Sequence, residues 1–312
     1  MQDLDLPIGE AADAAVNFVL DHFTPALDGI AAAIALVTDS LRDALVGLPA
    51  PVVIAGIALL ALWRVGWKFS VFAVAALALI MGMNLWPRMM ETLSLVLAAT
   101  GFAMLVGIPL GIAMARSNAV QGIARPVLDL MQTMPAFVYL IPAAMFFGLG
   151  AVPGTIATVI FAMPPVVRLT NLGLRQVHSE FIEAGLAFGC TPTQLLLKVQ
   201  IPNALPSIMA GINQTIMLSL SMVVIASMIG AGGLGNTVLT GIQRLDVGTG
   251  FEGGLAVVVL AVLLDRITQS FGTARPSLFG GLRAALASRK PAEAEAEDAA
   301  PQGQPQGQPG RA

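Results

Sequence analysis

Few side chains in this sequence could take part in bond-making chemistry, and their spacing brings none of them together. The chain has one cysteine, Cys190, and two histidines, His22 and His178, too few and too scattered for a set of metal ligands. It contains no GxSxG nucleophile motif, no HExxH zinc motif and no lysine that follows a Gly-rich phosphate loop. We therefore expect no catalytic residue, no metal and no bound cofactor.

One glycine pattern imitates a cofactor site. Gly230, Gly232 and Gly235 spell GxGxxG, which binds dinucleotides when it follows a β-strand and opens a helix in a βαβ unit. Here the pattern follows a long apolar segment instead of a strand. We expect a flexible turn at this place.

The composition and the spacing of the charges then indicate which class of protein this is. Of 312 residues, 56% are hydrophobic and 11% are charged, and the net charge is only −3. A soluble domain has roughly a quarter of its residues charged. The charges are also far apart, with 24 uncharged residues after Glu91, 38 after Asp129 and 45 after Lys198. This pattern excludes an ordinary soluble domain, and the absence of a basic run makes nucleic acid an unsuitable partner.

Seven apolar segments are long enough to cross a membrane as helices. A span needs about 20 residues, and a charge at its centre costs roughly 2.5 to 3.5 kcal/mol, so the spans must fit between charges. The segments are 51–67, 69–86, 90–115, 131–150, 152–170, 207–230 and 251–271. The first is the weakest because it contains Arg64, although an arginine near a helix end can reach the headgroups. The predicted fold class is an all-α polytopic membrane protein with about seven transmembrane helices.

The basic residues that flank these segments predict an orientation. Nine lie on one side, namely Arg64, Lys68, Arg116, Arg125, Arg168, Arg175, Lys198, Arg266 and Arg275, and three lie on the other, namely Arg42, Arg88 and Arg244. The richer side faces the cytosol in membrane proteins. The N-terminus is therefore expected outside, and the C-terminus and Cys190 in the cytosol.

Both ends of the chain differ from the middle. Residues 1–48 are expected to form an extracytoplasmic tail, in which Ile30, Ile34, Val37, Leu41, Leu45 and Leu48 recur at helical spacing. We interpret this stripe as an amphipathic helix on the membrane surface, with an eighth partial span as the alternative. Residues 276–312 end in a stretch rich in Ala, Glu, Pro, Gln and Gly and are expected to be a disordered cytosolic tail.

The loop between the fifth and sixth segments contains the start and stop signals of two helices. The first, at 178–188, is expected to end at Gly189 in the left-handed conformation. The second is expected to begin with a capping box, with Thr191 as the cap, Pro192 at the first helical position and Gln194 three residues after the cap. Pro202 and Pro206 are expected to stop it and to start the next span. Its apolar side chains, Phe181, Ile182, Leu186, Phe188, Leu195, Leu196 and Leu197, are too many for a solvated hairpin, so we expect a partner to cover them.

This loop carries a resemblance to a known family. The membrane subunits of bacterial ABC importers have Glu-Ala-Ala, three residues, Gly, nine residues and then Ile-x-Leu-Pro in a cytosolic loop. The sequence matches this spacing with Glu183, Ala184, Gly185, then Gly189, then Val199, Gln200, Ile201 and Pro202. It departs at Gly185, Val199 and Ile201, and each replacement is small or apolar. The segments MQTMPAFVYLIP, FAMPPVVRLTNLG, KVQIPNALPSIMAGINQT and LSLSMVVIASMIGAGGLG further resemble glycine betaine/proline permeases.

The resemblance covers roughly residues 45–275 and implies more than the residues alone. It implies a type I importer permease with two accessory helices at 49–87 and a five-helix core at 88–275, which includes a cytosolic coupling hairpin at 175–206. It also implies two cytosolic ATPase subunits that bind the ATP, a periplasmic or lipid-anchored solute-binding protein and a location in the bacterial inner membrane. A second permease chain is implied as well, and the resemblance favours an identical copy, with a sister chain as the alternative. Glu183, Ala184, Gly185, Gly189, Thr191, Pro192, Ile201 and Pro202 would then contact the ATPase and transmit its motion.

The solute and its path stay open at this point. Glycine betaine, proline betaine, choline and proline all fit the resemblance. Asn213, Gln214, Ser219 and Tyr139 are candidates to line the path, with helix packing as the alternative role for each. A carrier that works without ATP would usually have ionisable residues inside the membrane, and only Asp265 and Arg266 come near.

Overall fold

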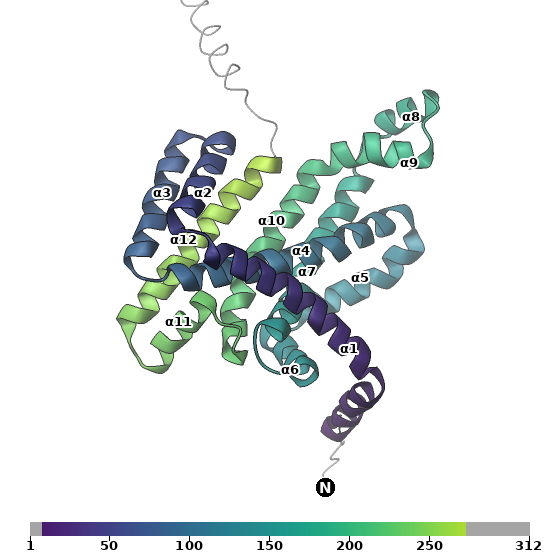
Figure 1. Ribbon diagram of the computed structural model, residues 1–312. Coiled ribbons are helices and arrows are strands. Elements are labelled where there is room, and N and C mark those ends of the chain that lie inside the picture. Colours follow the sequence, from purple (N-terminus) through teal and green to yellow (C-terminus); the bar gives the residue numbers. More distant parts are fainter. Residues whose placement is uncertain (1–7, 273–312) are drawn as a thin grey trace, which may run out of the picture. The chain divides into compact units, whose positions relative to one another are not determined.

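The computed structural model describes residues 8–272, and every regular element within that range is a helix (Figure 1). The all-α fold predicted from the sequence is confirmed. The first half contains α1 (Ile8–Gly47), α2 (Ala50–Arg64), α3 (Trp67–Gly82), α4 (Trp86–Arg116), α5 (Asn118–Thr133) and α6 (Ala136–Phe147). The second half contains α7 (Ala151–Arg175), α8 (Ser179–Ala187), α9 (Pro192–Leu195), η1 (Leu196–Gln200), α10 (Ile201–Ala226), η2 (Ser227–Ile229), α11 (Gly233–Gln243) and α12 (Val247–Gly272). The predicted tail at 276–312 lies outside the described residues.

Four helical stretches in the described range are long and apolar enough to cross a membrane. They are Trp86–Arg116, Ala151–Arg175, Pro192–Ile229 and Val247–Gly272, and the number rises to six if two bent helix pairs each count as one span. The predicted spans at 90–115, 152–170, 207–230 and 251–271 agree with these four stretches, although the third stretch begins 15 residues before the prediction. The predicted number of about seven is higher, because α2 and α3 have only 15 and 16 residues.

The predicted span at 131–150 is wrong as a single helix. The structure has α5 and α6 there, and their axes are bent by 101° at a short break. The cause is Pro135, which forces the preceding Met134 out of the helical region to φ −74° and ψ 135°. The sequence analysis also left residues 118–130 without a helix, although Ser117 caps α5 by accepting a hydrogen bond from the N–H of Val120.

The helix α7 lies at the centre of the bundle, between α4 and α10. Glycines permit the close approach of these three helices. A Cβ atom at Gly107 would lie 2.7 Å from Val166, and one at Gly111 would lie 2.7 Å from the carbonyl oxygen of Val167. The GxxxG pattern of α4 is therefore a packing surface, as small residues are in many membrane helix pairs.

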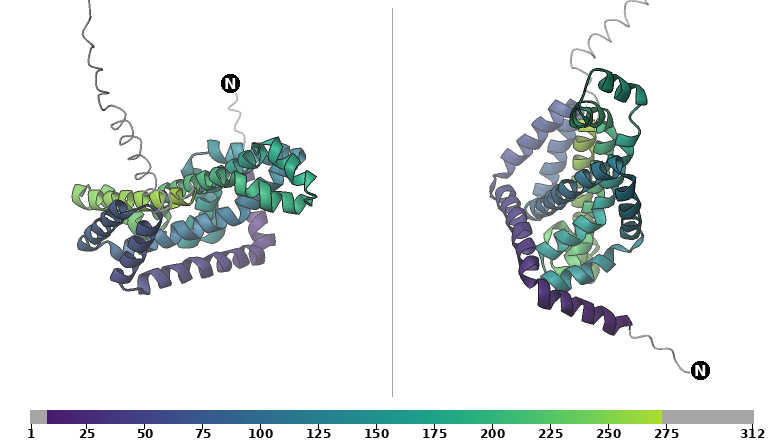
Figure 2. Two further views of the ribbon diagram at one scale, coloured as in Figure 1. Left: turned by 90° about the horizontal axis from the view of Figure 1, so that it is seen from above. Right: turned by 90° about the vertical axis from the view of Figure 1, so that its right-hand side faces the viewer.

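The helix α1 packs on the bundle, where the sequence analysis expected it to lie on the membrane surface. It contacts α4, α6 and α7, and both views of Figure 2 show it along the outside of the other helices. Its buried side chains are Ile34 and Thr38, whereas Ile30 and Val37 of the predicted stripe are exposed. A bend of 102° then separates α1 from α2.

Arg64, the charge inside the weakest predicted span, lies at the last residue of α2. Its guanidinium donates a hydrogen bond of 2.8 Å to the carbonyl oxygen of Ser270 and lies 4.1 Å from the ring centroid of Phe271. A cation is favoured at a helix C-terminus, and here it joins α2 to the end of α12. The accessory helices are thus attached to the bundle at this end.

Candidate functional site

The loop before α10 folds as a helical hairpin that extends from one end of the bundle (Figure 1). Its first helix, α8, ends at Gly189 with φ 75°. The N–H of Gly189 donates to the carbonyl of Leu186 at 2.9 Å, and the N–H of Cys190 donates to that of Gly185 at 3.0 Å. These two bonds define a Schellman C-cap, so the predicted end of the first helix is confirmed.

The second helix of the hairpin begins as the sequence predicts. The Thr191 hydroxyl accepts from the N–H of Gln194, and the Gln194 side chain accepts from the N–H of Thr191, with Pro192 at the first helical position. This reciprocal capping box satisfies two N–H groups at the helix start. It fixes the direction in which the chain leaves the short connection between α8 and α9.

The predicted stop at Pro202 and Pro206 is wrong. The chain continues from α9 through η1, a π-helical segment at Leu196–Gln200, directly into α10. A proline has no N–H and its ring crowds the carbonyl one turn before it, which the wider π-helical turn accommodates. The second helix of the hairpin and the following span therefore form one helical stretch of 38 residues, Pro192–Ile229.

The two helices of the hairpin touch at Gly185. This residue is the buried position of α8, and a Cβ atom there would lie 2.7 Å from Cδ1 of Leu195. Glu183 and Ala184 lie on the exposed side of α8, and Ile201 and Pro202 lie where η1 becomes α10. The structure thus brings the predicted coupling residues into one hairpin and its root.

A set of large apolar side chains on this hairpin is uncovered. The exposed fractions are 49% for Phe181, 55% for Leu186, 88% for Phe188 and 58% for Leu197. We call these four residues the hairpin apolar face. Large apolar side chains left exposed on one short hairpin are typical of a protein interface.

Arg175, at the last residue of α7, holds the root of the hairpin. Its guanidinium donates to the carbonyl of Met114 at 2.8 Å, to Asn118 Oδ1 at 2.8 Å and to Asn171 Oδ1 at 3.1 Å. These bonds join the ends of α4 and α7 to the start of α5. The sequence analysis treated Arg175 only as a topology marker, and its place in the last turn of a helix was the one available signal.

Three of the four candidate path residues are engaged within the chain. Asn213 donates to Asp265 Oδ1 at 2.8 Å, Tyr139 donates to the carbonyl of Met131 at 2.5 Å, and Ser219 accepts from Thr100 at 3.3 Å. These bonds join α10 to α12, α6 to α5, and α4 to α10. Gln214 alone among the four is exposed, on a face of α10 that also presents Ser221.

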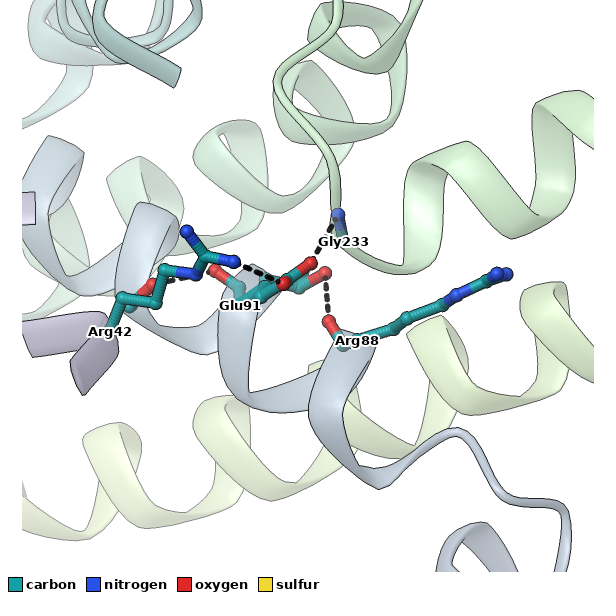
Figure 3. A network of polar contacts seen from close by, with 6 residues as sticks. Arg42, Arg88, Glu91 and Gly233 are labelled. Atoms are coloured by element: carbon teal, nitrogen blue, oxygen red, sulfur yellow. Dashed lines mark hydrogen bonds and ion pairs between the residues drawn. The ribbon is translucent and has the colours of Figure 1, made fainter. Parts of the chain in front are cut away.

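The opposite end of the bundle carries the Gly-rich turn of residues 230–233. The prediction of a flexible turn there needs correction, because polar contacts hold it (Figure 3). Glu91 Oε2 accepts from the N–H of Gly233 at 3.1 Å, and Glu91 Oε1 pairs with Arg42 at 2.9 Å. A cavity of about 300 Å³ adjoins these groups. The sequence analysis missed Glu91, since nothing local links it to a turn 142 residues later.

The fold and the hairpin together are those of a membrane permease subunit of an importer. The solved inward-facing structure of the MetNI methionine ABC transporter matches with a TM-score of 0.53 over 62% of this chain and 98% of that chain, at 23% sequence identity. This likeness concerns the fold. It agrees with the type I importer core expected from the sequence.

The family is shown by sequence. Residues 107–274 match the family described as binding-protein-dependent transport system inner membrane component, and the chain belongs to it. It is 48% identical over 268 residues to the glycine betaine/proline betaine transport system permease protein ProW of Escherichia coli, covering 86% of this chain and 75% of that protein.

Two further relatives are also permease proteins named for glycine betaine transport. The glycine betaine/carnitine transport permease protein GbuB of Listeria monocytogenes is 58% identical over 66% of this chain and 73% of its own. The glycine betaine transport system permease protein OpuAB of Bacillus subtilis is 44% identical over 87% of this chain and 96% of its own. The chain is thus a multi-pass permease subunit of a transport system.

Proposed function

We propose that this permease imports glycine betaine or a related quaternary-amine solute, driven by a separate ATPase. The observation that carries the ATP coupling is the hairpin apolar face, which lies on a hairpin whose two helices are both capped. The three relatives described above are all named for glycine betaine, which supports this solute over choline or proline.

The hairpin is suited to transmit motion. The connection between α8 and α9 is closed by the Schellman bonds at its start and the capping box at its end, and α8 packs on α9 and η1 at Gly185, so the hairpin moves as one body. The helical stretch Pro192–Ile229 joins it directly to a membrane span. Two ATPase subunits, each binding ATP and one hairpin, would bias a pair of permease chains between inward-open and outward-open states. Moving such an equilibrium from 1:99 to 99:1 takes about 5.5 kcal/mol, which weak binding of a small solute does not provide.

The exposed face of α10 supports Gln214 as a residue of the path or of the contact with the second permease chain. A polar side chain at membrane depth is unfavourable against lipid, and Gln214 is exposed in the single chain. Asn213, Tyr139 and Ser219 have partners within the chain, so we assign them to helix packing. The second chain is proposed to be an identical copy.

The orientation is tested with the natural thiol. Cys190 is the single cysteine of the chain and lies half-buried in the hairpin. We propose a cytosolic hairpin and an extracytoplasmic N-terminus, so a membrane-impermeant maleimide should label Cys190 in inverted vesicles and not in intact cells. A Ser40→Cys, Cys190→Ser variant should show the opposite labelling. Labelling of Cys190 from outside intact cells would refute the orientation.

The function is tested by uptake in cells that lack other osmolyte transporters. The chain, expressed with its ATPase and solute-binding protein, should take up labelled glycine betaine, and unlabelled choline or proline should compete less well than glycine betaine. An ATPase inactivated at its nucleotide site is the matched control and should abolish uptake. Uptake that persists with this ATPase would instead support a carrier that works without ATP.

A further inference from the structure

The start of α11 has no cap of its own, and side chains of α4 supply one. A helix N-terminus leaves up to four N–H groups without partners, which Ser, Thr, Asp or Asn at the N-cap normally helps to satisfy. The N-cap of α11 is Gly232, which has no side chain. The N–H of Gly233 donates to Glu91 Oε2 at 3.1 Å, and the N–H of Leu234 donates to Thr92 Oγ1 at 2.8 Å.

The glycines of the turn allow this close approach. Gly233 has φ 70°, and a Cβ atom there would lie 2.4 Å from Thr92 Oγ1. Gly232 has φ 83°, a region that other residues rarely adopt. Gly232 and Gly233 thus let the backbone N–H groups at the start of α11 reach two acceptors on a neighbouring helix.

The second oxygen of Glu91 brings in a third helix. Glu91 Oε1 accepts from Arg42 Nη2 of α1 at 2.9 Å, with 26% of the Glu91 side chain and 52% of the Arg42 side chain exposed (Figure 3). One carboxylate therefore joins α1, α4 and α11. We call the contacts among Arg42, Glu91, Thr92 and the N–H groups of Gly233 and Leu234 the α11 clamp.

Neighbouring bonds hold the turn from other directions. Arg88 Nη1 donates to Thr237 Oγ1 at 2.7 Å, and these residues lie one helical turn before Glu91 in α4 and one turn after Gly233 in α11. The N–H of Gly150, before α7, donates to the carbonyl of Ile229 at 2.9 Å. The turn is therefore fixed to α4 on one side and to the start of α7 on the other.

The α11 clamp matters for the movement of α10 because the turn that it holds follows directly after the end of that helical stretch. The helical stretch Pro192–Ile229 begins in the hairpin and ends at this turn, with π-helical residues at its first part and 3₁₀ residues at its last. If its far end were free, movement of the hairpin would slide the whole stretch along its axis. With the far end fixed, the same movement must bend or rotate the middle of α10.

We propose that Glu91, oriented by Arg42, is a positioning residue that fixes the far end of α10 and thereby makes hairpin movement productive for transport. This inference rests on the proposed coupling function of the hairpin. A hydrogen bond to a charged group corresponds to a factor of roughly 10 to 100 in an equilibrium constant. The half-exposed pair with Arg42 corresponds to a factor of about 5 or less. Glu91 therefore dominates the clamp, and Arg42 adds to it.

The test measures solute imported per ATP hydrolysed, in liposomes that contain the permease with its ATPase and binding protein. Glu91→Ala should keep ATP hydrolysis but lower this ratio about tenfold or more. Glu91→Gln, whose amide oxygen still accepts from Gly233, should fall between it and wild type, and Arg42→Ala should lower the ratio only a few-fold. Asp39→Asn is the matched control, since Asp39 borders the same cavity without a bond to the clamp, and it should keep the wild-type ratio.

A charge swap distinguishes an effect of the hydrogen bond to Gly233 from an effect of the ion pair alone. In Arg42→Glu with Glu91→Arg, the pair is restored but an arginine cannot accept from the N–H of Gly233. The swap should therefore stay as low as Glu91→Ala. Recovery of the wild-type ratio by the swap, or a wild-type ratio in Glu91→Ala, would overturn the proposal. If Glu91→Ala does not assemble, wild-type ratios in both Glu91→Gln and Arg42→Ala overturn it.

The failure of the proposed function gives a different result. In that case the wild-type complex itself imports no solute when ATP is supplied. The clamp proposal fails when the wild-type complex couples ATP to uptake and the clamp variants or the charge swap give the overturning ratios named above.

Discussion

Replacing Phe188 by alanine should weaken binding of the ATPase and leave the permease folded. Phe188 follows the last residue of α8 and is 88% exposed, so its ring contributes little to packing within the chain. Substitutions at such surface positions usually change the free energy of unfolding by less than about 0.5 kcal/mol. The thermal midpoint of the purified permease should therefore stay within about 2 °C of the wild-type value, since such a change in a chain of this size shifts it little.

The expected loss of binding follows from the apolar surface of Phe188 that the ATPase would bury and that the alanine variant lacks. Burying an exposed phenylalanine side chain fully is worth about 1.5 to 3 kcal/mol. If the ATPase covers Phe188, the dissociation constant should rise by a factor of roughly 10 to 150 in the alanine variant. Phe181, Leu186 and Leu197 are already about half covered, so alanine at any one of them should cost less.

The assay is a titration of labelled ATPase onto the permease in lipid nanodiscs, with thermal unfolding measured in parallel. Phe251→Ala is a matched control, because Phe251 is 69% exposed at the start of α12, at the end opposite to the hairpin. A dissociation constant within twofold of wild type for Phe188→Ala would refute the docking of the ATPase on the hairpin apolar face. An equal loss in Phe251→Ala would refute its localisation to the hairpin.

Three further predictions concern packing and pH. Gly185→Ala should bind the ATPase with a dissociation constant within about threefold of wild type, because the added Cβ meets only the flexible end of the Leu195 side chain. Gly185→Leu should separate α8 from α9 and abolish binding in the same titration. Gly111→Val should cost about 1 to 3 kcal/mol in thermal unfolding, because its Cβ meets backbone at 2.7 Å, whereas Gly122→Val, whose Cβ has open space, should not. Asp246 accepts from the Thr249 hydroxyl and N–H, which lower the pKa of its carboxyl. Because the pKa of Asp246 is lower in the folded state, its ionised carboxylate stabilises the fold above the ordinary pKa of about 4, and this stabilisation is lost as the pH falls. The difference in thermal midpoint between wild type and Asp246→Ala should therefore shrink below about pH 4. An equal difference at pH 3 and pH 7 would contradict this.

The hairpin was predictable because its signals are local. The Schellman end at Gly189 and the capping box at Thr191 each depend on residues within six positions of one another. Bonds of this range are encoded in the sequence itself and form whether or not the rest of the fold is known. Of the seven apolar side chains that the sequence indicated, Phe181, Leu186, Phe188 and Leu197 are exposed, whereas Ile182 and Leu195 are half-buried and Leu196 is buried.

The helix breaks were predicted less well, since hydropathy does not report backbone geometry. The segment 131–150 is apolar throughout, but Pro135 ends α5 and sets α6 at 101° to it. Pro202 misled in the opposite direction, because a π-helical turn before it lets the helix continue. The outcome at each proline depends on whether neighbouring backbone can supply or relieve the lost hydrogen bond.

The contacts of the α11 clamp could not be read from the sequence. Glu91 is 49 residues from Arg42 and 142 residues from Gly233, and no periodicity connects positions so far apart. The stripe of α1 was predicted only in part: Ile34 is buried and Leu41 and Leu45 are half-buried, but Ile30, Val37 and Leu48 are exposed and Thr38 is buried instead, because α1 packs against α4, α6 and α7. Tertiary partners decided both features.

The two ends of the stretch Pro192–Ile229 are held unequally, and this difference limits where movement can go. At the hairpin end, the polar bonds of α8 and α9 stay within the hairpin, and Arg175 holds only its root. At the other end, the turn is bonded to α4 and to Gly150. A displacement applied to the hairpin must therefore be taken up between these ends, and η1 offers the irregular backbone where bending costs least. The exposed face of α10 that carries Gln214 lies between η1 and the fixed end, so the proposed coupling predicts that this part of the span turns when the hairpin moves.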